Sequence, residues 1–95
     1  MPKAYWIAHV TVTNPDQYKH YASDAPIAFK KYGATILARG GTHQQMEGGR
    51  RPRNVVIEFP SLQSALDCYN SAEYQAARAR RAEAGEADIV IVEGV

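Results

Sequence analysis

Four segments of the chain have the composition of β-strands, and two helical patterns separate them in a fixed order. The strand-like segments are rich in aromatic and β-branched residues and comprise 4–12, 34–39, 54–59 and 87–93. A helical pattern follows the first segment and another follows the third. This order, β-α-β-β-α-β, predicts an α+β fold of the ferredoxin-like type, with two helices on one face of a four-stranded antiparallel sheet.

The helical patterns carry their own start and stop signals. Asn14 is an N-cap candidate, and Gly33 is placed to end the first helix. Pro26 lies inside that helix and is expected to kink or break it. Ser61 predicts the start of the second helix, and Ser71 predicts a new start after an interruption, so we expect that helix in two pieces.

Alternation along the strands divides their side chains into two sets. The first is wholly apolar and is expected under the helices: Trp6, Ala8, Val10, Val12, Val55, Ile57, Phe59, Val90 and Val92. The second is mixed and is expected on the other face: Tyr5, Ile7, His9, Thr11, Val56, Glu58, Ile89, Ile91 and Glu93. Because this second set is too apolar to be left in water, and two helices cannot cover both faces, we predict a homodimer formed through the sheet face.

The length and cysteine content support the same expectation. A chain of 95 residues is one domain, 1–95, with a small core that often needs additional support. The single cysteine, Cys68, excludes an intramolecular disulfide and a four-cysteine zinc site. A second copy of the chain is the remaining source of stability.

The net charge and the hydropathy of the chain exclude some classes of partner and some cellular locations. Eleven Lys and Arg against ten Asp and Glu give a net charge of +1, which does not favour nucleic acid or an anionic membrane as a partner. No apolar run approaches the roughly 18 residues of a membrane span, and the first residues lack a signal-peptide pattern. We therefore expect a cytoplasmic protein, and the sequence predicts no metal and no bound cofactor.

Several phrases of the sequence together resemble one family. They are Ala4-Tyr5-Trp6-Ile7-Ala8, Lys31-Tyr32-Gly33, Leu37-Ala38-Arg39-Gly40-Gly41, Val55-Val56-Ile57-Glu58-Phe59-Pro60-Ser61 and Ser71-Ala72-Glu73-Tyr74-Gln75. In this order they resemble the family called domain of unknown function 1330, over nearly the whole chain. The resemblance implies a dimeric α+β barrel, in which two ferredoxin-like sheets pair. It implies no reaction, because the family's activity is not established.

The wider structural relatives of that family are functionally diverse. They include cofactor-free quinol monooxygenases, muconolactone isomerase-like enzymes, haem-binding proteins similar to chlorite dismutase, and stress-responsive barrels. The chain departs from the family pattern at two places. Cys68-Tyr69 stands where members commonly have an aromatic pair, and Ala72 stands where they commonly have a proline.

Three ionisable residues are the candidate catalytic group. His9 lies in the middle of a strand and is a candidate acid or base, because imidazole is the side chain that most readily exchanges a proton near neutral pH. Glu58 and Arg39 end neighbouring strands and are expected to pair, with Arg39 binding a substrate carboxylate and Glu58 acting as base or orienting His9. The alternative is structural: a histidine packed at the dimer interface, and an ion pair that fixes the register of the dimer.

Four further residues are candidates for ligand binding. Tyr69 and Tyr74 flank the helix interruption, and their hydroxyls are placed to bond a ligand; the alternative is that both belong to the core. Tyr5 lies on the mixed face. Arg53 belongs to a cluster with Arg50 and Arg51 that either attracts an anion to a pocket or is a solvated turn.

Two functions therefore remain open on sequence alone. One is a homodimer that binds a small organic ligand and acts on it by acid–base chemistry of the isomerase or monooxygenase kind, without metal or cofactor. The other is a non-catalytic binding or stress-associated dimer. Haem binding is a third and more distant alternative.

Overall fold

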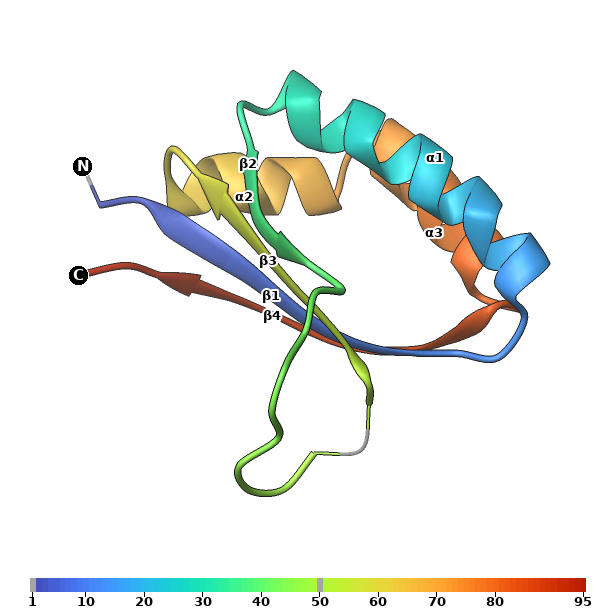
Figure 1. The fold of residues 1–95 in the computed structure, drawn as a ribbon. Helices are drawn as coiled ribbons and strands as arrows, with labels where there is room; N and C mark the ends of the chain where they lie inside the picture. The colour runs from blue at the N-terminus through green and yellow to red at the C-terminus, as the bar shows by residue number, and fades with distance from the viewer. Residues whose placement is uncertain (1, 50) are drawn as a thin grey trace.

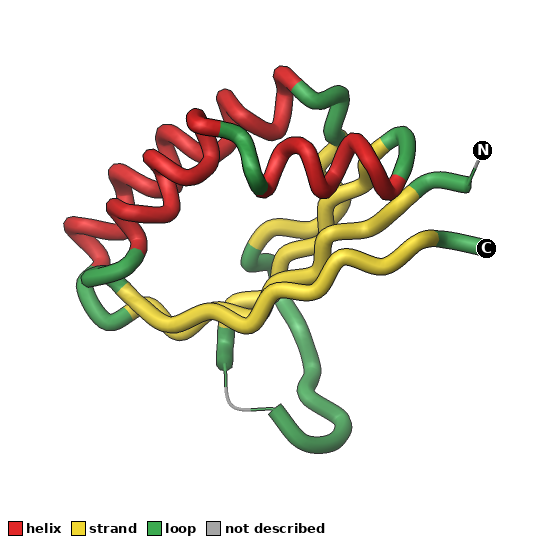
Figure 2. Tube along the Cα trace, turned by 180° about the vertical axis from the view of Figure 1, so that it is seen from behind, coloured by secondary structure: helices red, strands yellow, loops and turns green. Residues whose placement is uncertain are grey.

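The computed structural model describes residues 2–49 and 51–95. The elements are β1 (Ala4–Val12), α1 (Pro15–Lys31), β2 (Thr35–Arg39), β3 (Arg53–Phe59), α2 (Leu62–Tyr69), α3 (Ala72–Arg81) and β4 (Gly85–Glu93). The strands form one antiparallel sheet in the order β2-β3-β1-β4. All helices lie on one face of this sheet (Figures 1 and 2). The predicted ferredoxin-like α+β fold is confirmed.

The predicted caps begin the helices. The side chain of Asn14 accepts a hydrogen bond from the backbone of Gln17 at the start of α1. Ser61 and Ser71 do the same for α2 and α3, so the second helix is in two pieces as predicted. The predicted break at Pro26 is wrong, because α1 continues through it. Helix residues on both sides of Pro26 are buried in the core, and this packing offsets the lost backbone hydrogen bond.

An aromatic cluster around Trp6 forms the centre of the core. Trp6 is 1% exposed and meets the ring of Tyr74 at a centroid distance of 4.8 Å and that of Phe29 at 5.1 Å, both edge to face. These residues come from β1, α3 and α1 respectively, so the cluster joins the sheet to two of the helices. Phe59 of β3 is stacked with the indole at a centroid distance of 6.0 Å.

The side-chain directions of β4 are opposite to those predicted. Trp6 pairs with Ile91 and Ala8 pairs with Ile89 across the β1–β4 ladder, so both isoleucines lie on the helix-covered face. Val90 and Val92 lie on the open face, where they are 55% and 47% exposed. Residues 89–92 are all apolar, so the sequence does not show which of them face the helices, and the register of β4 with β1 determines it instead.

A β-bulge interrupts the pairing of β2 with β3. The register shift falls between Ile36 and Ala38, at Leu37. As a result Arg39 pairs with Val55, whose side chain lies under the helices. The connection from β2 to β3, described for residues 40–49 and 51–52, projects from the sheet on the side opposite the helices (Figure 1).

Within the described residues, no helix combines the length and the apolar character needed to cross a lipid bilayer.

Candidate functional site

The sheet separates the three predicted catalytic residues. His9 pairs with Asn54 in the β1–β3 ladder and Glu58 pairs with Tyr5, so both lie on the open face. Arg39 lies on the other face, under α1. The predicted Glu58–Arg39 pair is therefore wrong, because the bulge in β2 turns Arg39 away from the open face.

His9 and Glu58 are also distant from each other along the strands. Their partners on β1 and β3 place them four residues apart, which is about 13 Å in a β-strand. His9 Nδ1 instead lies 2.7 Å from Asn54 Oδ1, and Glu58 forms an ion pair of 3.1 Å with Lys3. The expectation that Glu58 orients His9 is therefore wrong. His9 is exposed and has an amide as its hydrogen-bond partner.

The predicted ligand-binding residues are distributed over both faces. Tyr5 is on the open face, next to Gly94. Tyr69 is half-buried, with its ring 5.6 Å from that of Trp6, and Tyr74 is completely buried. Both tyrosines therefore belong to the core, which was the stated alternative.

The arginine cluster before β3 is dispersed. Arg51 forms ion pairs with Glu86 at 3.0 Å and Asp88 at 2.8 Å on the open face. Arg53 points to the helix-covered face, where it meets the ring of Tyr18. Arg50 lies outside the described residues.

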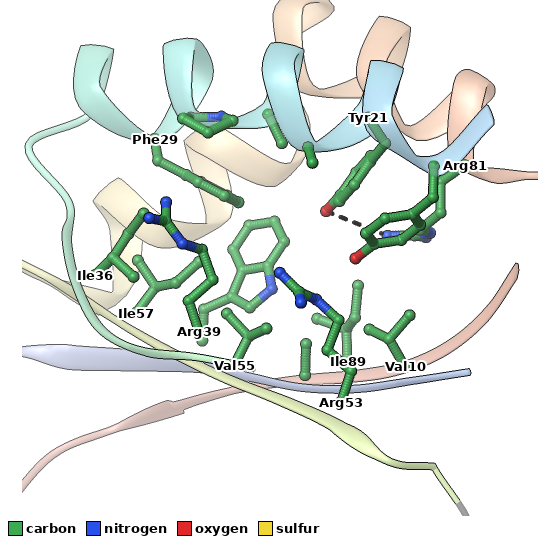
Figure 3. Close-up of a pocket in the computed structure, with 16 residues that line it drawn as sticks. Val10, Tyr21, Phe29, Ile36, Arg39, Arg53, Val55, Ile57, Arg81 and Ile89 are labelled. Atoms are coloured by element: carbon green, nitrogen blue, oxygen red, sulfur yellow. Dashed lines mark hydrogen bonds between the residues drawn. The ribbon is translucent and has the colours of Figure 1, made fainter. Parts of the chain in front are cut away.

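A cavity of about 60 Å³ lies between α1 and the sheet, and it brings arginine and tyrosine side chains of several elements together (Figure 3). Its floor is apolar and comes from β1, β3 and β4. Its polar lining consists of tyrosines of α1 and three arginines from three different elements. The principal lining residues are Trp6, Val10, Val55, Ile57, Ile89, Tyr18, Tyr21, Phe29, Arg39, Arg53 and Arg81.

Arg53 is held in this cavity by close packing. Its guanidinium carbon lies 5.6 Å from the centroid of the Tyr18 ring, a cation–π distance. Its Nε is buried and has no hydrogen-bond partner among the described residues. Gly40 adopts φ = +66°, and a Cβ atom there would lie 2.4 Å from Nη1 of Arg53. The left-handed backbone favours glycine at this position, and an added side chain would also push the Arg53 guanidinium aside.

A chain of hydrogen bonds leads from Arg81 through Tyr74 to Tyr21. Arg81 Nη1 lies 2.9 Å from the Tyr74 hydroxyl, which lies 2.9 Å from the Tyr21 hydroxyl. The guanidinium also lies over the Tyr21 ring at 5.1 Å. Burial raises the pKa of both tyrosines above the usual 10.0, so both hydroxyls remain protonated at neutral pH.

The direction of this chain follows from what each group can donate. A guanidinium only donates, so the Tyr74 oxygen accepts from Arg81. Tyr74 is 0% exposed, and among the described residues its hydroxyl has Tyr21 as its one other partner, so its own proton is satisfied by donation to Tyr21. The hydroxyl proton of Tyr21, which lines the cavity, is then free to bind a ligand. The cavity therefore presents an oriented donor above an apolar floor.

Sequence reasoning missed Tyr21 and Arg81 as site residues. Tyr21 is on the apolar stripe of α1, where a tyrosine is typical of the core. Arg81 is in the last turn of its helix, where a cation is expected for electrostatic reasons alone. No spacing in the sequence relates them, because 60 residues separate them and only the packing of α1 against α3 brings them together. Within 2–49 and 51–95, no group of three His, Cys, Asp or Glu side chains is placed to hold a metal ion.

Comparison with known proteins agrees with the resemblance seen in the sequence. The model of the family described as domain of unknown function (DUF1330) matches residues 3–95. The chain belongs to this family. No match was found among curated proteins.

Solved structures with the same fold are distant in sequence. A protein of unknown function from Rhodopseudomonas palustris has a TM-score of 0.74 and 16% identity, over 99% of this chain and 83% of that one. SnoaB, a cofactor-independent oxygenase from Streptomyces nogalater, has a TM-score of 0.69 and 9% identity, over 100% and 95%. A dimeric ferredoxin-like protein of unknown function from Thermobifida fusca has a TM-score of 0.61 and 15% identity, over 98% and 92%. At these identities the likeness concerns the fold.

Proposed function

We propose that this DUF1330 protein binds a small organic ligand in the cavity between α1 and the sheet. The observation that carries the proposal is the combination of an apolar floor with a few convergent polar groups, which is typical of small-molecule sites. Tyr21 supplies an oriented hydroxyl, and Trp6 and Phe29 supply aromatic surface.

Ligand binding requires the cavity to widen. Its volume of about 60 Å³ is smaller than the roughly 150 Å³ of an apolar cavity that accepts benzene. Arg39 belongs to the edge strand β2 and is exposed, so its side chain is free to move outward. We expect the Arg39 side chain to shift outward while still lining the cavity, so that a ring-sized ligand can occupy the space beside the indole of Trp6.

Native mass spectrometry of freshly purified protein tests this proposal. A co-purified small molecule is expected on the wild type and is expected to be lost from Ala22→Leu, which adds volume at the cavity lining. Ala79→Leu is the matched control, because Ala79 is an exposed helical alanine outside that lining. Equal occupancy in the two variants would place the ligand elsewhere and overturn the proposal.

A second candidate function is cofactor-free oxygenation or isomerisation of the bound ligand. The free donor proton of Tyr21 favours it, because such a donor stabilises the oxyanion that a bound phenol becomes when it gives its proton to solvent water. The shared fold with the oxygenase SnoaB is consistent with it. Oxygen consumption with an added hydroquinone tests it: the wild type is expected to accelerate consumption and Tyr21→Phe is not. The absence of any acceleration would leave the binding function alone.

We also propose that the protein is a homodimer formed through the open face of the sheet. Val90 and Val92 are about half exposed on this face, beside Ile7 and Val56 of the neighbouring strands. An apolar sheet surface without helices over it is stabilised by a second sheet. The related fold from Thermobifida fusca is described as dimeric.

Sedimentation velocity at micromolar concentration tests the dimer. Val90→Glu is expected to give monomers, because it buries an unpaired carboxylate between the sheets. Ile27→Glu is the matched control, since Ile27 is 67% exposed on α1, away from this face. A stable wild-type monomer would refute the proposal.

A further inference from the structure

The cavity under α1 contains positive charge that no described residue neutralises. Arg39, Arg53 and Arg81 line it, and none of them takes part in an ion pair within residues 2–49 and 51–95. The chain as a whole is nearly neutral, with a net charge of +1. The ion pairs of acidic side chains lie elsewhere: Lys3–Glu58, Asp16–Lys19, Lys31–Glu73, Arg51–Glu86, Arg51–Asp88 and Arg80–Asp24. Three guanidinium groups around one cavity are therefore a local concentration of charge.

The polar groups of the cavity are donors in need of acceptors. Guanidinium groups only donate, and the Tyr21 hydroxyl has its proton free once it has accepted from Tyr74. Among the described residues, no Asp, Glu, Asn, Gln or His side chain lines the cavity. Arg81 already donates to the tyrosine hydroxyls, so it is Arg39, Arg53 and Tyr21 whose acceptors have to come from solvent or from a ligand.

Arg53 gives the most specific indication. Its Nε is buried without a partner, and a buried donor that finds no acceptor is costly. The stacking of the guanidinium on Tyr18 and its close approach to Gly40 fix its position but do not satisfy that donor. An oxygen atom placed in the plane of the guanidinium would satisfy it.

We propose that the ligand is an anion, specifically a small organic carboxylate with an apolar ring; this inference rests on the ligand-binding function proposed above. The carboxylate binds to Arg53 and Arg39, whose planar guanidinium groups match its two oxygens. The ring lies against Trp6 on the apolar floor. Tyr21, held by Tyr74 and Arg81, donates to a second oxygen of the ligand.

A matched pair of probes tests the charge of the ligand. 4-Methylbenzoate and 4-methylbenzamide have nearly the same shape and differ in charge at neutral pH. Their binding is followed through the fluorescence of Trp6, which is the single tryptophan of the chain and lines the cavity. We expect the benzoate to bind about tenfold or more tightly than the benzamide, as for one charge-assisted hydrogen bond.

Substitutions then assign the preference to the cavity. Arg53→Gln and Arg39→Gln are each expected to weaken benzoate binding about tenfold and to weaken benzamide binding less, so that the preference for the benzoate shrinks. Gly40→Ala is expected to have the same effect by displacing the Arg53 guanidinium without removing its charge. Arg80→Gln is the matched control, because this arginine pairs with Asp24 outside the cavity. Thermal melts establish that each variant folds, and Arg39→Gln, at an exposed side chain, carries the test if Arg53→Gln does not fold.

The outcomes separate this inference from the proposed function. Equal binding of the two probes, abolished by Ala22→Leu, would overturn the anion inference and leave the ligand-binding cavity standing. A benzoate preference that survives both arginine substitutions would place the anion elsewhere and overturn the inference. Failure of both probes to change Trp6 fluorescence up to millimolar concentration would count against both proposals.

Discussion

Replacement of Tyr74 by phenylalanine is the sharpest test of the hydrogen-bonded chain behind the cavity. The substitution keeps the ring, which packs edge to face on Trp6, and removes only the hydroxyl. That hydroxyl is the middle of the chain: it accepts from Arg81 at 2.9 Å and donates to Tyr21 at 2.9 Å. Both neighbours lose a partner in one step.

The expected loss of stability is about 2 kcal/mol. A neutral hydrogen bond contributes about 0.5–1.5 kcal/mol and one to a charged group about 1.5–3 kcal/mol. The lower part of the second range applies here, because Arg81 is only half-buried and bonds Tyr21 as well, at 3.5 Å. For a domain of this size a loss of about 2 kcal/mol lowers Tm by roughly 8–16 °C.

Urea and thermal unfolding, followed by circular dichroism at one fixed protein concentration, measure this loss. Tyr69→Phe is the matched control: Tyr69 also packs on Trp6, but its hydroxyl has no hydrogen bond among the described residues. We expect this control to stay within about 0.5 kcal/mol of wild type. The double variant Tyr21→Phe/Tyr74→Phe is expected to lose less than the sum of the two single variants, because both remove the same bond.

Two results would refute the reasoning. If Tyr74→Phe is as stable as Tyr69→Phe, the chain from Arg81 to Tyr21 does not stabilise the fold. If the effects of Tyr21→Phe and Tyr74→Phe simply add, the two hydroxyls are not bonded to each other. In either case Tyr21 is no longer an oriented donor, and the oxygenation proposal loses its support.

Three further predictions concern other parts of the molecule. Burial raises the pKa of the Cys68 thiol from 9.0 to about 12. Because the unfolded chain loses this proton at lower pH than the folded protein, the thiol makes its full contribution to the free energy of unfolding below about pH 9, and this contribution is lost as the pH rises toward 12. Cys68→Ala is expected to make the fall of the unfolding free energy at alkaline pH shallower by one proton. An unchanged slope would contradict the burial of the thiol. Gly85→Ala is expected to lower the free energy of unfolding by about 1–3 kcal/mol, because its Cβ would lie 2.3 Å from the carbonyl oxygen of Thr11. Gly41→Ala is the control in the same unfolding assay: a Cβ there has no atom within 4 Å, so we expect it to be neutral or stabilising. His9→Ala is expected to leave probe binding in the cavity unchanged, because His9 lies on the other face of the sheet; a tenfold loss would show that the two faces are coupled.

The order and type of the elements were predictable because several local signals agree. Asn14, Ser61 and Ser71 each cap a helix in the structure, and the strand segments contain the residues that pleated surfaces favour. The apolar side chains of β1 and β3 alternate strictly enough to assign their faces correctly, as the burial of Trp6 and Ile57 demonstrates.

The prediction of side-chain direction was wrong in two strands whose local sequence does not determine it. The run 89–92 is apolar throughout, so only hydrogen bonding to β1 determines which members face the helices. In β2 the bulge lies at Leu37, a residue with no conformational signature, and it reverses the direction of Arg39. The bulge removes Arg39 from the face of the other two residues, and the four-residue separation of His9 and Glu58 along the strands keeps those two apart, so the predicted trio does not form.

The alternation of β1 has a consequence for how such a chain can change over time. Trp6, Ala8 and Val10 line the cavity, whereas Tyr5, Ile7 and His9 face the opposite side of the same strand. A substitution of a residue that lines the cavity leaves the side chains on the open face unchanged, and the reverse is also true. The lining of the cavity and the open face of the sheet can therefore diverge independently in evolution, although both include side chains of the same nine-residue strand.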